Sequence, residues 1–542
     1  MPRRSGNPAR RASGLSETDR LAQRIAVTIG KGRSPKRSNE LEDYFHRSPR
    51  DIFVALDGAV ANMAATAGHK PLAYGYLFLL EGLLVHLRYR IDRGYADAID
   101  LVAEFQAALA ARVRDRSIDG PMLGLVVGVL QQAGIAAASE LVEASAALSE
   151  QRTGAVLEAD LDATMVEMVE ACGGDPFALV ASGAEACHAM PEEARGAMVT
   201  AFASSDHPVT RSAAVLFLLD PSPETRMAAA AALARVCAAL LPADVRRLIA
   251  MREWRPEQER AAIDALVRRA HEAGIDAAPW PAGGAEEILA SAVDGATSQG
   301  LVIVCPSGRK KRISSILVKD GIADAFVGSE MSLRQTDATI TRAAVEGQMA
   351  PVSRGYVDDV VSHYLATLAA RGTVPPVGLL EVAEAMGGAD WRPVRLEFEA
   401  VLAGLLASVP KALLAHESVR AILRRSGRLA DLIQVADSWF EDDADISRTF
   451  AGSRGAGGRE KRAKYLLQTS FQQRRGKWAD LFLRTAVWLR EVDEADQRYW
   501  PELAIVAKAV AEGRNLAEIG LMLRIASRTV DFLEANPRRD WS

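Results

Sequence analysis

Apolar residues recur at three- and four-residue steps along most of the chain, which is the period of an amphipathic α-helix. The first clear run, after residue 50, places four apolar side chains on one helix face: Ile52, Leu56, Val60 and Met63. A strongly apolar helix follows over 72–90, and further helices are indicated at 95–113 and 121–132. Because the connections between them are short, neighbouring helices are expected to run antiparallel.

The stretch 301–327 has a different pattern, because its β-branched runs are bounded by the turn dipeptides Ser307-Gly308 and Asp320-Gly321. It predicts strands at 301–305 and 313–319 and a short third strand at 322–327. Apolar residues occupy both alternating phases, and a lone hairpin is marginal in water, so this element is expected to pack against helices of the flanking arrays. The expected fold is therefore mostly α: an irregular α-solenoid or helical array with one small β-hairpin or three-stranded β element near 301–327.

Breaks in the pattern divide the chain into six segments. The Pro- and Gly-rich stretch 279–284 is the main internal break before the β element. The expected segments are a disordered basic tail (1–39), an N-terminal helical array (40–298), the β element with its basic turn (299–330), a second helical array (331–450), a flexible Gly-rich loop (451–458) and a C-terminal helical segment (459–542).

A short internal repeat lies in the first array. Pro208-Val-Thr-Arg211-Ser-Ala-Ala recurs as Pro223-Glu-Thr-Arg226-Met-Ala-Ala. Proline costs no hydrogen bond at a helix start, and the small alanines let adjacent helices approach closely. This spacing resembles the helices of HEAT-type repeats. The resemblance implies helix pairs stacked into a superhelix and indicates no particular ligand.

Composition restricts the classes of function. The 542 residues carry a formal charge of −5, which gives no general attraction to nucleic acid or to anionic membranes. The four cysteines include no Cys-x-x-Cys pair, so neither a zinc site nor a disulfide framework is expected. No apolar stretch is long enough to span a bilayer, and no secretory signal follows the basic start. These features predict a cytoplasmic protein with no membrane partner, no metal and no cofactor.

Two basic segments are candidate contacts for phosphates or an acidic partner. The first is the hairpin tip, with Arg309, Lys310, Lys311 and Arg312. The second lies between Gly452 and Trp478, where eight Lys or Arg accompany one Glu; its candidate contacts are Arg459, Lys461, Arg462, Lys464, Arg474, Arg475 and Lys477. Three interleaved rings could stack on bases: Tyr465, Phe471 and Trp478. The alternatives are a charged tip that protects an edge hairpin and an amphipathic helix with a solvated basic face.

The C-terminal stretch from Val506 to Val530 resembles a LuxR-type helix-turn-helix, with Gly513, Glu518-Ile519 and Thr529-Val530 at matching places. The resemblance implies that the last helix reads DNA. Asp531 and Glu534 depart from that role, because acids facing the groove repel phosphate.

No motif for a catalytic centre stands in a supporting context, so no catalytic residue is assigned. An enzyme would have to depend on a polar cluster of Cys187, His188 and His207, and the spacing of these residues favours a structural role. The pattern favours a non-enzymatic helical-repeat scaffold or interaction protein that binds another macromolecule, chiefly a protein. The alternative is a nucleic-acid-binding regulatory protein that uses the patches 307–312 and 454–477 and the C-terminal helix-turn-helix.

Overall fold

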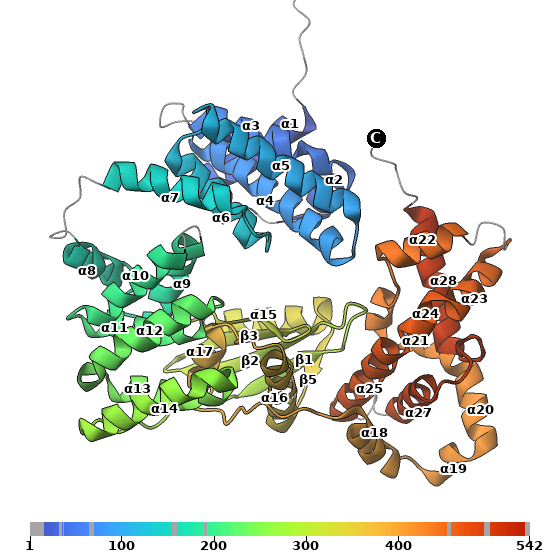
Figure 1. The fold of residues 1–542 in the computed structure, drawn as a ribbon. Helices are drawn as coiled ribbons and strands as arrows, with labels where there is room; N and C mark the ends of the chain where they lie inside the picture. Colours follow the sequence, from blue (N-terminus) through green and yellow to red (C-terminus); the bar gives the residue numbers. More distant parts are fainter. Residues whose placement is uncertain are drawn as a thin grey trace, which may run out of the picture. The chain divides into compact units, whose positions relative to one another are not determined.

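The computed structural model describes residues 16–31, 35, 37–63, 70–153, 161–188, 192–452, 457–492 and 499–536. These residues are mostly α-helical with one small antiparallel sheet, which confirms the expected fold class at that level (Figure 1). The chain divides into two compact units, Met1–Glu158 with Gly183–Pro191 and Ala159–Ser182 with Glu192–Ser542. The expected N-terminal array, 40–298, is therefore divided between the two units.

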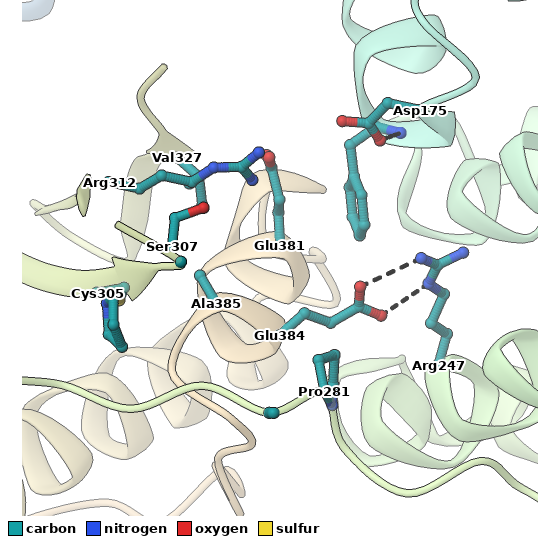
Figure 2. Close-up of a pocket in the computed structure, with 14 residues that line it drawn as sticks. Asp175, Arg247, Pro281, Cys305, Ser307, Arg312, Val327, Glu381, Glu384 and Ala385 are labelled. Carbon is teal, nitrogen blue, oxygen red and sulfur yellow. Dashed lines mark hydrogen bonds and ion pairs between the residues drawn. The ribbon is translucent and has the colours of Figure 1, made fainter. Parts of the chain in front are cut away.

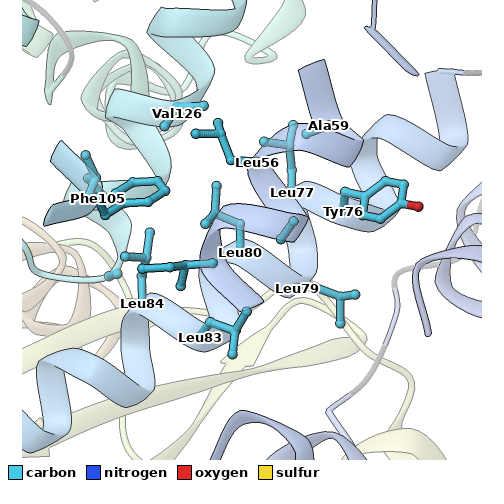
Figure 3. Packing of buried hydrophobic residues seen from close by; sticks show 14 of the residues in the cluster. Leu56, Ala59, Tyr76, Leu77, Leu79, Leu80, Leu83, Leu84, Phe105 and Val126 are labelled. Carbon is cyan, nitrogen blue, oxygen red and sulfur yellow. The ribbon is translucent and has the colours of Figure 1, made fainter. Parts of the chain in front are cut away.

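The first unit is a helical bundle. Its elements are α1 (Glu17–Gly30), α2 (Asn39–Arg47), η1 (Pro49–Asp51), α3 (Ile52–Met63), α4 (Lys70–Asp92), α5 (Ala96–Arg114), α6 (Gly120–Gln132) and α7 (Ser139–Thr153). Leu80 and Leu84 of α4 are fully buried with Leu56 of α3, Phe105 of α5 and Val126 of α6 (Figure 3). Burying one such side chain stabilises the fold by roughly 1.5–3 kcal/mol. The unit thus has a core of its own.

Helix α1 corrects the expectation of a disordered tail over 1–39. Ser16 caps the helix and forms a capping box with Asp19. Leu21, Ala22 and Ile25 are buried on one face, which packs against α4. The many arginines around these apolar positions concealed their helical spacing. Residues 1–15 lie outside the described residues.

The second unit begins with α8 (Leu161–Ala171), the part of α9 (Pro176–His188) up to Ser182, α10 (Glu192–Ser204), α11 (Pro208–Leu216), α12 (Pro223–Arg235), α13 (Pro242–Met251) and α14 (Glu257–Glu272). After the sheet it continues with α16 (Arg354–Ala370), α17 (Gly378–Ala385), α18 (Phe398–Ala407), α19 (Lys411–Leu414), α20 (His416–Arg425), α21 (Leu429–Leu432), α22 (Ala444–Gly452), α23 (Arg459–Gln468), α24 (Ser470–Gln473), α25 (Arg475–Glu491), α27 (Trp500–Ala511) and α28 (Gly520–Ala535). Of the expected loop at 451–458, residues 451 and 452 end α22, and 453–456 lie outside the described residues.

The internal repeat corresponds to α11 and α12, which both begin at a proline. Arg211 donates a hydrogen bond to the carbonyl of Ser205 at 2.6 Å, and Arg226 donates one to the carbonyl of Asp220 at 2.9 Å. Both arginines thus reach the carbonyl six residues upstream. The repeated arginine closes the turn that precedes each helix.

The sheet has five antiparallel strands in the order β4-β3-β2-β1-β5. They are β1 (Glu287–Ser291), β2 (Gln299–Ser307), β3 (Lys310–Val318), β4 (Ile322–Val327) and β5 (Met349–Pro351), with α15 (Leu333–Glu346) between β4 and β5. The three expected strands are confirmed as β2, β3 and β4. Strands β1 and β5 are additional, and they bring the sheet from three strands to five.

The two faces of the sheet are covered unequally. On the inner face, Leu301 pairs with Ile316 and Ile303 with Ser314, and all four side chains are fully buried. Helix α16 reaches this face, because the Nε2 atom of Gln299 donates to the hydroxyl of Tyr356 at 2.6 Å. The Nε1 atom of Trp488 in α25 donates to the carbonyl of Ala290 in β1 at 2.9 Å. The inner face is therefore the junction between the sheet and its flanking helices.

The outer face keeps apolar side chains in solvent. Leu317 is 42% exposed and Phe326 is 52% exposed on neighbouring strands β3 and β4. Helix α15 covers another part of this face, and Thr336 is its one buried residue. Among the described residues, no helix combines the length and apolar character that a membrane crossing requires.

Candidate functional site

The hairpin formed by β2 and β3 carries at its turn the basic residues that the sequence marked as candidate contacts. Ser307 pairs with Lys310, and the two-residue turn between them has Gly308 at φ +60°, a conformation that favours glycine. Lys310 pairs with Glu330 at 3.2 Å, and Lys311 pairs with Glu286 at 2.9 Å. Half of the cations at the tip are therefore neutralised locally.

A cavity of about 430 Å³ opens beside the turn end of this hairpin (Figure 2). We call it the hairpin pocket. It is lined by the start of α9 and the residue before it, by α13, α17, the hairpin, the end of β4 and the segment before β1: Asp175, Phe177, Arg247, Pro281, Ala282, Cys305, Pro306, Ser307, Gly308, Arg312, Val327, Glu381, Glu384 and Ala385. The segment flagged by the sequence thus forms one wall, and the other walls come from distant parts of the second unit.

An ion network holds one wall of the pocket. Glu384 of α17 accepts hydrogen bonds from Arg247 Nε and from Arg246 of α13, both at 2.8 Å. Burial alone would raise the pKa of Glu384, but the two arginines outweigh it and hold that pKa below its usual value. Arg247 also lies over the ring of Phe177 at 4.9 Å. This network fixes α17, and with it the sheet, to α13.

Glu381 is in a different electrostatic state. Burial, and then the charge of Asp175, raises the pKa of Glu381 to about 7, although Arg312 acts in the opposite direction. Its carboxyl group accepts a hydrogen bond from the backbone N–H of Val327 on the edge strand β4. A carboxyl group of this kind can hold or release a proton near neutral pH.

The remaining polar groups of the pocket are less suited to catalysis. The Cys305 thiol is 1% exposed, and burial raises its pKa, which disfavours a nucleophilic thiolate. The hydroxyl of Ser307 donates to Glu330 at 2.8 Å. The Nε atom of Arg312 is buried and has no hydrogen-bond partner among the described residues. The pocket can therefore admit a small polar ligand, and its geometry assigns no catalytic group.

Glu381→Gln is expected to stabilise the protein at alkaline pH. Because the pKa of Glu381 is about 7 when folded, the native state of the wild type loses stability as pH rises from the ordinary carboxyl range to 7. The variant avoids this loss, so its unfolding free energy should exceed the wild type's by about 1–3 kcal/mol at pH 8 and by about a quarter of that amount at pH 5. Urea titrations at both pH values measure the difference.

The matched control is Glu330→Gln, since the Ser307 hydroxyl and Lys310 hold the pKa of this exposed carboxyl below its usual value. Its stability difference from the wild type should not grow between pH 5 and pH 8. Equal slopes for wild type and Glu381→Gln would contradict the assigned protonation of Glu381.

The basic segment of α23–α25 is largely ion-paired. Its cations contact acids from other parts of the second unit or within the segment: Arg459 with Asp531, Arg462 with Glu534, Lys464 with Glu460, Arg474 with Asp443 and Lys477 with Glu441. Arg475 donates to the carbonyls of Val510 and Arg514. Lys461 is exposed and makes no ion pair within the described part of the chain.

The three interleaved rings do not share one surface. Phe471 and Trp478 are fully buried, with ring centroids 6.1 Å apart. Neither ring therefore offers a face to a base. Tyr465 is 37% exposed and is the one of the three that reaches solvent.

The C-terminal hairpin is packed on both sides of its last helix. Leu521, Met522, Ile525 and Val530 of α28 are fully buried. On its polar side, Arg524 pairs with Asp431 and Asp531 pairs with Arg459. The helix corresponding to a LuxR-type recognition helix thus has its polar groups engaged within the protein.

The sequence reasoning missed the acidic wall of the hairpin pocket. Arg247 and Glu384 are 137 residues apart, so no local spacing connects them. Asp175 follows Gly173-Gly174 and accepts a hydrogen bond from the N–H of Phe177 at 2.9 Å, which is a turn signal and no sign of a pocket. Cys187 and His188 have side chains outside the described residues. Among the described residues, no cluster of His, Cys, Asp and Glu could hold a metal ion.

Comparison with protein families matches two helical segments of the chain, and comparison with individual proteins gives a match over nearly the whole chain. Residues 191–274 match the family model described as the Y4lR second domain, and residues 399–534 match the Y4lR C-terminal helical domain. The chain is 27% identical over 517 residues to "Uncharacterized protein y4lR" of Sinorhizobium fredii (strain NBRC 101917 / NGR234), covering 92% of this chain and 96% of that protein. No solved structure matches. This chain is therefore similar to Y4lR along its length, and the five strands of the sheet lie between the two matched segments in the sequence.

Proposed function

We propose that this protein is a non-enzymatic interaction protein that binds another protein through its outer surface. We define the outer surface as the exposed side chains of α15 together with Leu317 and Phe326 on the outer sheet face. The observation that carries the proposal is the exposure of large apolar side chains on one folded layer: Phe326 at 52%, Leu333 at 54% and Val345 at 73%. We take these side chains to form one contact site, because exposed apolar patches are typical of protein–protein interfaces.

The helical frame supports a scaffold role. The repeated arginine contacts of α11 and α12 favour a HEAT-like array, whose extended surfaces commonly bind other proteins. Cys172, Cys237 and Cys305 are free thiols, which fits a reducing compartment such as the cytoplasm.

Nucleic-acid binding, the alternative, has weaker support. Most cations of the basic segment are paired with acids, and two of its three rings are buried. Arg309 at the hairpin tip remains exposed, so a weak electrostatic contact would center there. Binding of that kind would fall steeply as salt rises.

A pull-down from native lysate tests the proposal. Wild-type bait is expected to retain a protein after nuclease treatment. The double variant Phe326→Ser/Val345→Ser should reduce recovery of that protein at least about tenfold, because it removes two apolar side chains that would anchor the partner. The matched control is Met227→Ser/Ile249→Ser, because these residues are 60% and 47% exposed on α12 and α13. Loss of the captured protein with nuclease, or equal recovery by both variants, would remove the proposal.

A further inference from the structure

The charged side chains around the hairpin pocket fall into two groups, and the first group is fully engaged within the protein. Arg247 donates to Glu384 from Nε at 2.8 Å and from Nη2 at 3.2 Å, and its Nη1 atom donates to Asp244 at 3.4 Å. Glu384 also accepts a hydrogen bond from Arg246 at 2.8 Å. This wall of the pocket therefore has no charge left over for a ligand.

The second group consists of Arg312, Asp175 and Glu381, which are half-buried and make no ion pair within the described part of the chain. The Nε atom of Arg312 is buried and has no hydrogen-bond partner there. The carboxyl groups of Asp175 and Glu381 each accept one backbone hydrogen bond, from Phe177 and from Val327. Because a carboxylate can accept several hydrogen bonds, both retain capacity for another donor.

These three side chains bring opposite charges to one cavity from three separate elements. Arg312 comes from β3, Glu381 from α17 and Asp175 from the residue before α9 (Figure 2). They are close enough to interact, since the charge of Asp175 raises the pKa of Glu381 and that of Arg312 lowers it. Charges partly removed from water gain more from a partner than exposed charges do. A ligand with groups of both signs would therefore be stabilised in this pocket.

From this arrangement we propose that the hairpin pocket binds a free α-amino acid, whose carboxylate pairs with Arg312 and whose ammonium group lies between Asp175 and Glu381. The guanidinium fork matches a carboxylate, and an ammonium group has three hydrogen atoms to donate. A ligand of one sign alone would leave the opposite charge of the pocket unpaired, which favours the zwitterion.

The size and walls of the pocket agree with such a ligand. Its volume of about 430 Å³ falls within the range of small-molecule sites, roughly 300–1,000 Å³. Phe177, Pro281 and Ala385 supply apolar surface for the amino-acid side chain. No residue that defines the outer surface is among those that line the pocket, so this site is separate from the proposed protein contact.

Isothermal titration of the purified full-length protein tests the ligand class. The probes are the proteinogenic L-amino acids, each added alone, and at least one is expected to bind stoichiometrically. Two derivatives of that amino acid serve as matched controls: its amide, which lacks the carboxylate, and its N-acetyl form, which lacks the ammonium group. Each derivative should bind at least about tenfold more weakly, because one charge of the pocket stays unpaired.

Variants assign each charge of the ligand to its partner. Arg312→Gln and Asp175→Asn should each raise the dissociation constant at least about tenfold. Arg312→Gln should bind the amide about as well as the amino acid, whereas Asp175→Asn, which can keep the turn hydrogen bond from Phe177, should lose part of the penalty for the N-acetyl form. Arg309→Gln, exposed on the same hairpin and outside the pocket lining, should leave binding unchanged.

Three outcomes would overturn the proposal: no amino acid binds, binding survives both pocket variants, or Arg312→Gln still discriminates against the amide. Arg312→Lys keeps the positive charge, so it should retain discrimination against the amide even if Arg312→Gln fails to fold. Failure of this proposal leaves the proposed protein contact standing, because the lysate capture depends on Phe326 and Val345 and on no residue of the pocket.

Discussion

Ile316→Asp is expected to unfold the second unit as a whole. Ile316 is fully buried on the inner sheet face, where it pairs with Leu301 of β2 and Ala325 of β4. The change removes about 1.5–3 kcal/mol of apolar burial and adds several kcal/mol for an unpartnered buried charge. That sum is comparable to the whole stability of a typical domain, about 5–15 kcal/mol.

Limited proteolysis shows how far the damage extends. Cleavage is expected throughout Glu192–Ser542, because the inner face joins the sheet to α16 and α25, which follow it in the sequence. Glu384 of α17 in turn joins this part to α13, which precedes the sheet. The first unit should stay resistant, since it has a core of its own. The matched control is the next residue, Leu317→Asp, which is 42% exposed on the outer face and should cost less than about 1 kcal/mol. If Ile316→Asp is cut only near 305–320, the sheet is a peripheral insertion.

The sheet shows which parts of the fold were predictable. Strands β2, β3 and β4 are revealed by alternation and by two turns, and the structure places Gly308 and Asp320 at positive φ there. Strand β5 has three residues, too few for a pattern to form, and it pairs with β1 only after α15 has crossed the outer face. Strand β5 is extended because it pairs with β1, and this pairing cannot be inferred from the three residues themselves.

The candidate site, like the sheet, was only partly predictable from the sequence. Cys305, Ser307 and Arg312 lie in one conspicuous stretch, so the sequence marked the hairpin wall of the pocket. The basic segment was marked by its cations, but their partners Asp531 and Glu534 lie about 72 residues away and become visible only once α23 packs on α28. Counting charges in a segment cannot show that distant acids neutralise them.

Glu384→Ala is expected to loosen the junction between α13 and the sheet. Arg246 and Arg247 each have 9% of the side chain exposed, and Glu384 has 13%. Removing the shared carboxylate leaves two guanidinium groups buried together, with Asp244, Pro279 and two aromatic rings as their remaining neighbours. Breaking a buried ion pair in this way costs about 3–5 kcal/mol, and two cations share this one.

Urea unfolding of the full-length protein measures the loss, and Glu330→Ala is its control. Glu330 pairs with Lys310 in solvent, so its removal should cost less than about 1 kcal/mol. The triple variant Arg246→Met/Arg247→Met/Glu384→Leu removes both buried cations together with their shared carboxylate and keeps apolar volume. Asp244 loses Arg247 but keeps the hydrogen bond from the backbone N–H of Leu241 at 3.0 Å, so this variant should still be more stable than Glu384→Ala alone. If Glu384→Ala instead matches Glu330→Ala, the arginines find adequate partners without the carboxylate, and apolar contacts alone hold α17 against α13.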